Sequence, residues 1–370
     1  MVHDDLTLAE VGEFRLIDEV VLPLAEALGL GNTGGDDCAF VEAQGTIAVS
    51  ADVGPRPLVR SIPGYENDFE AAGWLAVVAT ASDIATAGAK PLFLTNCVDA
   101  PADLRVGDLR KFLTGAFRAC AAFGFANGGG DLRQGSRLEM RTFAAGSAPG
   151  GARLGRSGAK AGDHLVLIGR AGEVMANYLL ARCGAPDVVR EGLLTPATET
   201  LLRFPRPQVH AMPLLAERKL LVAASDTSDG LIGAIMNMAK ASRCGFDLEL
   251  AAAMLPPAVR QAADASGYSP WNIYFAWGDW SVAAAVPVTR LDEFASVCAT
   301  ESITWTPLGR ASGNRGLISA RIDGLGPHEV TPLRNENFLD LGFNAGLDAH
   351  LGHILGTSLF TTARSSGRLQ

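Results

Sequence analysis

The spacing of apolar positions changes several times between residues 12 and 145, and each change predicts a new element. Two short apolar runs, 38–41 and 46–50, flank a polar turn and predict a β-hairpin. A run of apolar and small residues at 69–87, followed by Gly88 and Pro91, predicts a buried helix. The other elements predicted here are helices at 12–28 and 107–123 and strands at 92–97, 125–126 and 139–145. This alternation of helix and strand predicts one α/β domain.

A second series of apolar runs follows the Pro- and Gly-rich stretch 147–151, where we place a domain boundary. The order of its elements echoes the first half and predicts a second α/β domain. Its strands are predicted at 164–169, 221–224, 247–250, 280–286 and 304–308, and its helices at 172–183, 208–218, 231–242 and 291–299. His350 and His353, three residues apart, are assigned to the surface of a terminal helix rather than to a metal.

Composition narrows the class of protein. Hydrophobic residues make up 48% of the 370 residues and charged residues 19%, and the mean hydropathy is +0.18, as in a compact globular protein. The formal net charge of −9 argues against nucleic acid or an anionic membrane as a partner. The six cysteines include no C-x-x-C pair, which argues against a zinc site or a disulfide framework. The acidic N-terminus and the lack of a membrane-length apolar run predict a cytoplasmic protein.

Acidic residues beside strand ends and glycines carry the candidate chemistry. In the predicted hairpin, the residues before the first strand and after the second lie at the same open end, which brings Asp36, Asp37 and Asp52 together. Carboxylates in one place repel one another unless a cation joins them. The acids in such positions are Asp37, Asp52, Asp83, Asp131, Asp226 and Asp229.

Metal and phosphate chemistry explains this set of acids better than Ca²⁺ storage does. Aspartate binds phosphate poorly because both are anionic, but it binds Mg²⁺ well, and Mg²⁺ binds phosphate oxygens. We therefore predict a magnesium–nucleotide site, in which Arg156 of the basic loop 155–163 meets the phosphates directly. The alternatives without a ligand are a solvated turn at 36–37 and helix capping by Ser228 or Asp229.

Seven motifs, in a fixed order along the chain, make the sequence similar to a known family. They are Gly12-Glu13-Phe14-x-Leu16-Ile17, Gly35-Asp36-Asp37-Cys38-Ala39, Ser50-Ala51-Asp52, Ser82-Asp83-Ile84-Ala85, Gly129-Gly130-Asp131, Arg156-Ser157-Gly158-Ala159-Lys160-x-Gly162-Asp163 and Ser228-Asp229-Gly230-Leu231. The family that they resemble is thiamine-monophosphate kinase, within the aminoimidazole ribonucleotide synthetase (PurM-like) superfamily.

The resemblance implies a two-domain PurM-like architecture of the α/β (α+β) class. It implies a homodimer in which the N-terminal domains pair across a barrel-like interface, with ATP between the two domains of each chain. On this basis residues 1–148 are the ATP- and Mg-binding and dimerisation domain, 149–330 are the C-terminal PurM-like domain, and 331–370 are a C-terminal extension. The expected cofactors are ATP and Mg²⁺, and the expected partners are a small-molecule acceptor and a second copy of the chain, without nucleic acid or membrane.

The resemblance also implies roles for individual residues. The expected metal ligands are Asp37, Ser50, Asp52, Asp83, Asp131, Asp226 and Asp229. Among them, Asp52, Asp131 and Asp229 are the expected catalytic residues, because metal ions stabilise the charge that develops during phosphoryl transfer. The residues expected to contact the nucleotide are Gly130, Asp131, Arg156 and Ser228.

The acceptor side departs from the family pattern. The family's Gly-Gly-Glu-Asp-Tyr-Glu-Leu is replaced by the sequence of residues 276–282, so that Gly278 stands where the substrate-contacting glutamate is expected. The stretch 54–58 lacks the family's Gly-Val-His-Phe, residues 132–134 replace its Thr-Thr-Arg, and Ala234 replaces an acid. Our candidates for the acceptor pocket are Arg56, Trp277 and Trp280.

Three functions follow from these expectations. The first is ATP- and Mg-dependent phosphoryl transfer, as in thiamine-monophosphate kinase, to a different small-molecule acceptor. The second is ATP-dependent activation of an amide or carbonyl oxygen, as in a synthetase or dehydratase of the same superfamily, which releases phosphate. The third is nucleotide binding without turnover.

Overall fold

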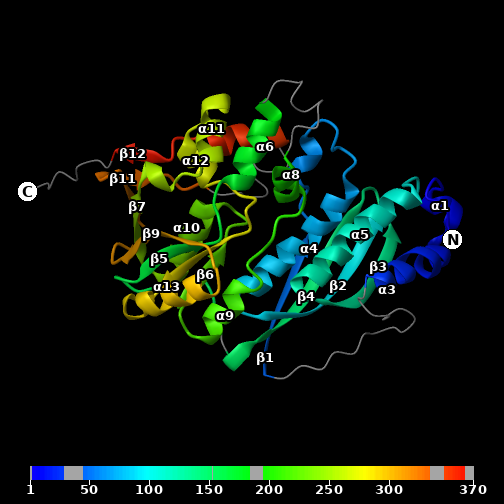
Figure 1. The fold of residues 1–370 in the computed structure, drawn as a ribbon, viewed down its shortest axis with the longest axis horizontal. Coiled ribbons are helices and arrows are strands. Elements are labelled where there is room, and N and C mark those ends of the chain that lie inside the picture. Colours follow the sequence, from blue (N-terminus) through cyan, green and yellow to red (C-terminus); the bar gives the residue numbers. More distant parts are fainter. Residues whose placement is uncertain (1, 29–44, 152, 184–194, 334–345, 363–370) are drawn as a thin grey trace, which may run out of the picture. The chain divides into compact units, whose positions relative to one another are not determined.

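The computed structural model describes residues 2–28, 45–151, 153–183, 195–333 and 346–362 (Figure 1). The chain forms two compact units: the first comprises Met1–Arg153 and Ala185–Glu217, and the second Leu154–Gly184 and Arg218–Gln370. The boundary lies close to the stretch 147–151, but the division by sequence placed 185–217 in the second domain. Of the helices in the described ranges, none has the length and apolar character needed to cross a membrane.

The first unit contains a four-stranded sheet in the order β1 (Thr46–Val53), β4 (Glu139–Ala148), β2 (Lys90–Ala100) and β3 (Ala126–Gln134). Strands β2 and β3 are parallel, and the other neighbours are antiparallel. The predicted hairpin strand 38–41 lies outside the described residues, and the partner that the structure shows for β1 is β4. Strand β3 is much longer than the predicted 125–126, so the glycines at 128–130 belong to a strand rather than to a loop.

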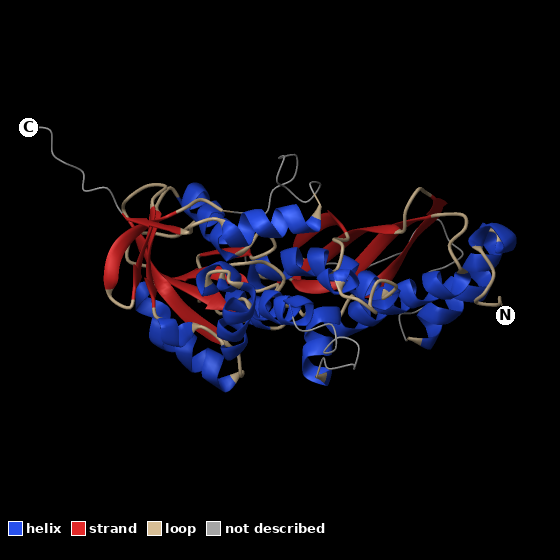
Figure 2. Cartoon of the chain, turned by 90° about the horizontal axis from the view of Figure 1, so that it is seen from above, coloured by secondary structure: helices blue, strands red, loops and turns tan. Residues whose placement is uncertain are grey.

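Helices α4 (Phe69–Thr86) and α5 (Val106–Phe123) lie side by side along one face of this sheet (Figures 1 and 2). Both were predicted to within about two residues. Their backbones touch through two glycines: a Cβ on Gly73 would lie 1.8 Å from the Phe112 carbonyl oxygen, and one on Gly115 would lie 1.9 Å from the Glu70 carbonyl oxygen. Asp68 caps α4 by accepting a hydrogen bond from the Ala71 N–H at 3.0 Å.

The N-terminal segment is helical, as predicted, but it is not one continuous helix. Its pieces are α1 (Leu8–Val11), α2 (Glu13–Leu16), a π-helical turn (Ile17–Val21) and α3 (Leu22–Ala27). Gly12, with φ of 82°, ends α1 because this left-handed conformation cannot continue a helix. A 3₁₀ turn, Leu58–Ser61, and another at Pro149–Gly151 complete this part of the unit.

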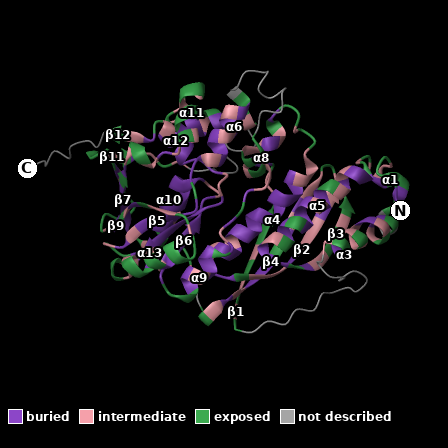
Figure 3. Cartoon of the chain, viewed as in Figure 1, coloured by how far each residue is buried: buried purple, intermediate pink, exposed green. Residues whose placement is uncertain are grey.

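Two helices that follow residue 195 also belong to the first unit, α8 (Pro196–Arg203) and α9 (Ala211–Glu217). The connection after α8 is held on α4, where the Trp74 indole N–H donates to the Pro205 carbonyl oxygen at 2.8 Å. Arg203 pairs with the N-cap Asp68, with Nε to Oδ2 at 2.6 Å. These contacts leave most of α4 buried (Figure 3).

The second unit contains an eight-stranded mixed sheet. Its order is β12 (Phe360–Thr362), β11 (Leu325–Val330), β10 (Ile318–Ile322), β7 (Gly245–Leu250), β9 (Trp305–Ser312), β5 (His164–Ile168), β8 (Val282–Val286) and β6 (Ala223–Asp226). The five predicted strands are present. Strands β10, β11 and β12 were not predicted, and β6 forms the edge of the sheet next to β8.

The helices of the second unit are α6 (Glu173–Cys183), α10 (Leu231–Ser242), α11 (Pro257–Ser266), α12 (Pro270–Tyr274), α13 (Leu291–Thr300) and α14 (Leu347–Gly356), with 3₁₀ turns at Ala252–Met254 and Val288–Arg290. Helix α10 follows edge strand β6 directly, so the residues between them lie at the carboxyl end of that strand. This junction and the loop before β8 are the parts of the unit that matter for the site.

Candidate active site

Three of the predicted metal ligands lie together in the first unit. Ser50 and Asp52 are two residues apart on β1, and Asp83 lies on α4, which covers the inner face of the sheet. The Ser50 hydroxyl donates to Asp83 Oδ2 at 2.6 Å. Asp52 pairs in register with Thr142, whose side chain is fully buried and bonded to Thr80 of α4, so Asp52 is on this same inner face.

The position of Asp83 favours a cation nearby. It lies in the last turn of α4, where the helix dipole places partial negative charge and disfavours a carboxylate by about 0.3–1 kcal/mol. The hydroxyl of Ser50 satisfies one of its oxygens. Carboxylate and hydroxyl oxygens are the ligands that Mg²⁺ and Ca²⁺ prefer, so the chemistry of this group of residues fits a hard divalent ion.

Asp131 is separated from this group by the geometry of the sheet. It lies on β3, at the opposite edge from β1, with β4 and β2 between, which at the usual strand spacing is about 14 Å. It also pairs in register with Cys97, one residue beyond the inward-facing Asn96, so it projects from the open face. There it approaches Arg133, with Nε to Oδ2 at 3.9 Å.

The glycine run before Asp131 creates this arrangement. The pairing of β2 with β3 shifts between Leu94 and Asn96, where two residues of β3, Gly128 and Gly129, pass one residue of β2. Gly130, the predicted nucleotide contact, lies against β2, and a Cβ there would be 2.3 Å from the Asn96 carbonyl oxygen. The sequence predicted glycine for close approach to a ligand, whereas in the structure the close approach is to a neighbouring strand.

The open face next to Asp131 ends in a charged hollow of about 310 Å³. Arg141 forms ion pairs with Asp99 and with Glu139, and Arg137 pairs with the same Glu139. Hydrogen bonding to Asp99 raises the pKa of Arg141 further above its ordinary value. The four charges compensate one another, so the hollow has no net charge to attract an anion or a cation.

The predicted ligands of the second unit follow edge strand β6. Asp226 is the last residue of the strand and is buried, and the Ser228 hydroxyl donates to its Oδ1 at 3.2 Å. Asp229 is partly exposed and precedes Gly230, the N-cap of α10. The segment 226–229 therefore presents two carboxylates and a hydroxyl at a helix N-terminus, which suits a metal ion with bound phosphate.

Arg156 lies in the same unit, in a loop that runs along β6. The Ala224 N–H donates to the Gly155 carbonyl oxygen at 2.8 Å, and Gly158 passes so close that a Cβ would lie 2.3 Å from the Val222 carbonyl oxygen. The Ser242 hydroxyl fixes the loop by donating to the Arg156 carbonyl oxygen at 3.1 Å. The Arg156 side chain itself is exposed, as a phosphate-binding side chain requires.

The predicted acceptor residues differ in their surroundings. Arg56 is exposed in the first unit and lowers the pKa of Arg60, together with the burial of Arg60. Trp277 and Trp280 are both buried in the second unit, each 8% exposed. The structure therefore brings Trp277 and Trp280 into one loop before β8 and shows Arg56 in the other unit.

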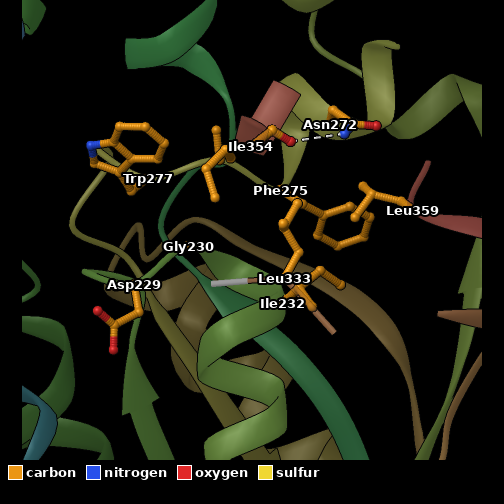
Figure 4. Close-up of a pocket in the computed structure, with 10 residues that line it drawn as sticks. Asp229, Gly230, Ile232, Asn272, Phe275, Trp277, Leu333, Ile354 and Leu359 are labelled. Atoms are coloured by element: carbon orange, nitrogen blue, oxygen red, sulfur yellow. Dashed lines mark hydrogen bonds between the residues drawn. The ribbon is translucent and has the colours of Figure 1, made fainter. Parts of the chain in front are cut away.

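The C-terminal helix α14 covers Trp277. The ring centroid of Trp277 lies 5.1 Å from that of His350, which is 1% exposed, so the assignment of His350 to the surface was wrong. The cavity beside Trp277 measures about 10 Å³, roughly what the centre of one water molecule needs. Apolar side chains fill most of it, and Figure 4 shows Phe275 and Leu359 on one side and the Asp229 carboxylate directed away from them.

Asn272 holds α14 in place and was not foreseen from the sequence. Its buried amide donates to the carbonyl oxygens of Ile354 at 3.0 Å and Thr357 at 2.7 Å, at the end of α14 (Figure 4). At the beginning of the helix, Arg182 forms an ion pair with Asp348 at 2.5 Å. Both ends of the helix that covers Trp277 are thus fixed by polar contacts.

Gly278 has a backbone conformation that L side chains rarely adopt. Its φ is +116°, and a Cβ would lie 2.8 Å from Val174 Cγ1. A glutamate of the family type therefore does not fit here without movement of the backbone or of Val174. The next residue is Asp279, and desolvation of its carboxyl raises its pKa to about 7 although the N–H groups of Gly172 and Val174 donate to it.

Each unit holds its own predicted metal ligands. Asp37 lies outside the ranges that the structure describes. Ser50, Asp52 and Asp83 meet in one group, Asp226, Ser228 and Asp229 in another, and Asp131 lies apart on the open face of its sheet. Among the described residues, no three His, Cys, Asp or Glu side chains converge on a point where they could hold an ion.

Two ranges of the chain match models of known protein domains. Residues 35–148 match the N-terminal domain of AIR synthase related proteins, and residues 160–320 match the C-terminal domain of the same proteins. The chain therefore belongs to the family of AIR synthase related proteins, the PurM-like superfamily, as its motifs predicted.

Relatives of known name place the chain more narrowly. It is 31% identical to thiamine-monophosphate kinase of Halobacterium salinarum over 288 residues, which are 78% of this chain and 92% of that protein. Its fold is similar to the structure "AaThiL complexed with AMPPCP and TMP", with a TM-score of 0.64 and 24% identity over 90% of this chain and 99% of that one. The hydrogenase maturation protein HypE in complex with ATP matches with a TM-score of 0.67 and 17% identity, over 87% and 95%. The chain is a thiamine-monophosphate kinase-like protein, and this group consists of ATP-dependent phosphotransferases.

Proposed function

We propose that the chain transfers the γ-phosphoryl group of ATP, with Mg²⁺, to a small-molecule acceptor other than thiamine monophosphate. Its relatives, named thiamine-monophosphate kinase, support the phosphoryl transfer. The observation that carries the change of acceptor is the geometry at Gly278, where φ is +116° and Val174 occupies the space that a side chain would need.

Each unit offers its own set of oxygen ligands for Mg²⁺. Ser50, Asp52 and Asp83 offer one set of oxygen ligands, and Asp226, Ser228 and Asp229 offer another. Mg²⁺ bound there would neutralise the charge that spreads over the transferred phosphoryl group. Asp37 and Asp131 remain proposed ligands from the family motifs, and Asp131 lies on β3, at the opposite edge of the sheet from β1.

The chain itself contributes position and electrostatics rather than a covalent nucleophile. The N-terminus of α10 directs N–H groups and positive dipole charge at the segment 226–229, where phosphate would bind. The exposed Arg156 side chain, on a loop fixed by Ser242, would meet a phosphate oxygen directly. Holding the acceptor in line with the γ-phosphate then accounts for catalysis.

In the proposed acceptor pocket, Gly278 stands in place of the glutamate that the family pattern predicts and offers no polar side chain to an acceptor. A glutamate at 278 could accept hydrogen bonds from an amino-substituted ring, whereas Gly278 and its neighbours Trp277 and Val174 offer apolar surface. Leu333, Ile354 and Leu359 line the cavity beside Trp277, which measures about 10 Å³ and has space for little more than a water molecule. An acceptor that binds here without movement of α14 must be smaller than thiamine monophosphate.

The test is turnover of ATP with Mg²⁺ and a panel of small acceptors that includes thiamine monophosphate, with ADP, free phosphate and phosphorylated acceptor measured together. We expect ADP and phosphorylated acceptor in equal amounts from a compound other than thiamine monophosphate. Phosphate release that depends on an acceptor would indicate oxygen activation instead, and ATP binding without ADP would indicate a binding protein. Asp83→Asn should weaken Mg-dependent ATP binding about tenfold or more.

We also propose that the chain forms a homodimer through the open face of the first sheet. Ile47, Val49 and Val53 of β1 and Phe143 of β4 are exposed there, and alternate residues of one strand share a face. An apolar sheet face of this kind is commonly covered by another subunit. Val49→Lys should yield monomers in light scattering, whereas Val288→Lys, an equally apolar exposed site in the second unit, should not.

A further inference from the structure

Ser281 lies where three loops of the second unit meet, and its side chain is 1% exposed. The loops are the turn 169–174 between β5 and α6, the segment 225–229 with the predicted metal ligands, and the segment 276–281 with the predicted acceptor residues.

The hydroxyl of Ser281 makes two hydrogen bonds to the turn 169–174, one as donor and one as acceptor. It donates to the Arg170 carbonyl oxygen at 2.6 Å and accepts from the Arg170 N–H at 3.0 Å. Asp279 extends the same contact, since its carboxylate accepts from the N–H of Gly172 at 2.8 Å and of Val174 at 3.0 Å. These two donors lie at the N-terminus of α6, where a carboxylate is favoured.

The backbone of Ser281 bonds the metal-ligand segment. Its carbonyl oxygen accepts from the Thr227 N–H at 3.0 Å and from the Thr227 hydroxyl at 3.1 Å, and its own N–H donates to that hydroxyl at 3.1 Å. Thr227 is buried and lies between the predicted ligands Asp226 and Ser228. The Leu231 N–H also donates to the Phe275 carbonyl oxygen at 2.9 Å, which ties the start of α10 to the acceptor side.

The surroundings allow little relaxation of this network. Gly172 packs against the backbone of α12, with a Cβ position 2.6 Å from Tyr274 Cα, and Gly278 packs against Val174. Trp280 has φ of 52°, a conformation that a non-glycine residue adopts only when its neighbours impose it. Buried polar networks that are fully bonded fix one geometry, because each lost bond leaves an unsatisfied group.

We propose that Ser281 and Asp279 are positioning residues that hold the metal-ligand segment 225–229 and the acceptor segment 276–281 in one fixed arrangement. The inference rests on the proposed function, because it assigns those segments to nucleotide and acceptor. It adds that the segments 225–229 and 276–281 are coupled within this unit. A substitution at Ser281 or Asp279 should therefore alter the binding of metal and phosphate as well as of the acceptor.

The experiment compares Ser281→Ala and Thr227→Val with Thr227→Ser and Ser266→Ala in the full-length chain. Thr227→Ser keeps the hydroxyl. Ser266 is the last residue of α11, and its hydroxyl donates to the Ala262 carbonyl oxygen at 2.6 Å and accepts from the Tyr268 N–H at 3.4 Å, so among the described residues it has no hydrogen bond to these loops. Mg²⁺ titrations of ATP binding, kcat and KM for ATP, and hydrogen exchange of the amides 225–229 are measured on folded protein.

In Ser281→Ala and Thr227→Val we expect at least a tenfold higher Mg²⁺ concentration at half-saturation, a larger loss in kcat than in KM, and faster amide exchange at 225–229. The double variant should be no worse than the poorer single variant, because both disrupt one network. Thr227→Ser and Ser266→Ala should resemble the unmodified chain.

Variants that only unfold at lower temperature, with unchanged Mg²⁺ titration and kcat, would overturn the positioning role and leave the proposed function intact. Additive losses in the double variant would likewise overturn it. Absence of Mg-dependent ATP binding by the unmodified chain would overturn the proposed function, and the inference with it.

Discussion

The two groups of predicted metal ligands are held in place by different means. In the first unit, Ser50 and Asp83 lie on a regular strand and a long helix, and packing fixes the helix on the sheet. In the second unit, Asp226 and Asp229 lie on either side of Thr227 and Ser228. Hydrogen bonds between Thr227 and the backbone of Ser281 hold this segment in place. The first group depends on the close contact of two helices, and the second on a few buried polar side chains.

Because of this difference, substitutions near the two groups should have different effects on stability and on ligand binding. A packing defect in the first unit changes the stability of the unit, because the contact of α4 with α5 is part of its core. A lost hydrogen bond in the second unit changes the position of a short segment while the sheet beneath it stays packed. Substitutions should therefore affect stability most in the first unit and ligand binding most in the second.

The largest effect is expected from Gly115→Ala at the crossing of α4 and α5. The new methyl group would lie 1.9 Å from the Glu70 carbonyl oxygen, so the helices must separate, at a cost of about 3 kcal/mol or more in unfolding free energy. Chemical denaturation measures the change. Gly352→Ala in α14, where no atom lies within 4 Å, is the matched control and should be neutral or slightly stabilising. Equal effects of both would contradict the packing argument.

Gly278→Glu should cost about 2–4 kcal/mol, because it combines a strained φ with a clash against Val174. The substitution restores the family residue, yet we expect no turnover of thiamine monophosphate. Making the same change in a Val174→Ala background removes the clash and should reduce the loss of stability, measured relative to Val174→Ala alone. A gain of thiamine monophosphate turnover in either background would argue that position 278 by itself sets the acceptor.

Arg156→Ala should weaken ATP binding by about 1.5–3 kcal/mol, the usual contribution of a hydrogen bond to a charged group. The loop should keep its shape, because Ser242 bonds the backbone of Arg156 and not its side chain. Calorimetry with an ATP analogue and Mg²⁺ measures the effect. Arg321→Ala, which removes an exposed ion pair with Glu249, is the control, and a similar loss there would assign the effect to net charge.

A further prediction is a pH dependence of stability from Asp279. The folded protein keeps this proton up to about pH 7, whereas the unfolded chain releases it near the ordinary pKa of 3.8. Between these values the folded state binds more protons, so the contribution to stability is full below pH 3.8 and is lost as the pH rises to about 7. Relative to the unmodified chain, Asp279→Asn should be more stable at pH 8 than at pH 5, and parallel curves would contradict the raised pKa.

Local signals in the sequence predicted much of the fold. Helix α4 follows from an apolar run with Gly88 and Pro91 after it, and these signals act within a few residues. The position of Asp131 could not be predicted in this way. Its face of the sheet depends on a bulge at Gly128 and Gly129, and a shift by one residue turns every later side chain over.

Long-range contacts set the remaining limits. The assignment of 196–217 to the first unit depends on the pairing of Arg203 with Asp68 and of Pro205 with Trp74, more than 130 positions apart in the chain. The bonds of Ser281 to Thr227 and Arg170 also join distant parts of the chain, 54 and 111 positions apart. One signal was available in the sequence. An acidic residue next to an apolar strand, such as Asp279, needs hydrogen-bond donors when it is buried, so such a residue is a candidate for a structural or functional role.

The return of the chain to the first unit at residues 185–217 has a consequence for its synthesis. The chain passes between the units three times, at 153/154, 184/185 and 217/218. During synthesis, β5 and α6 of the second unit leave the ribosome before α8 and α9, which complete the first unit. The first unit therefore cannot finish folding before part of the second unit has been made. If the chain were cut after residue 153, the Trp74 indole N–H in the first fragment would lose its hydrogen bond to the Pro205 carbonyl oxygen. We expect fragments 1–153 and 154–370 to reach the native structure only when they are produced together.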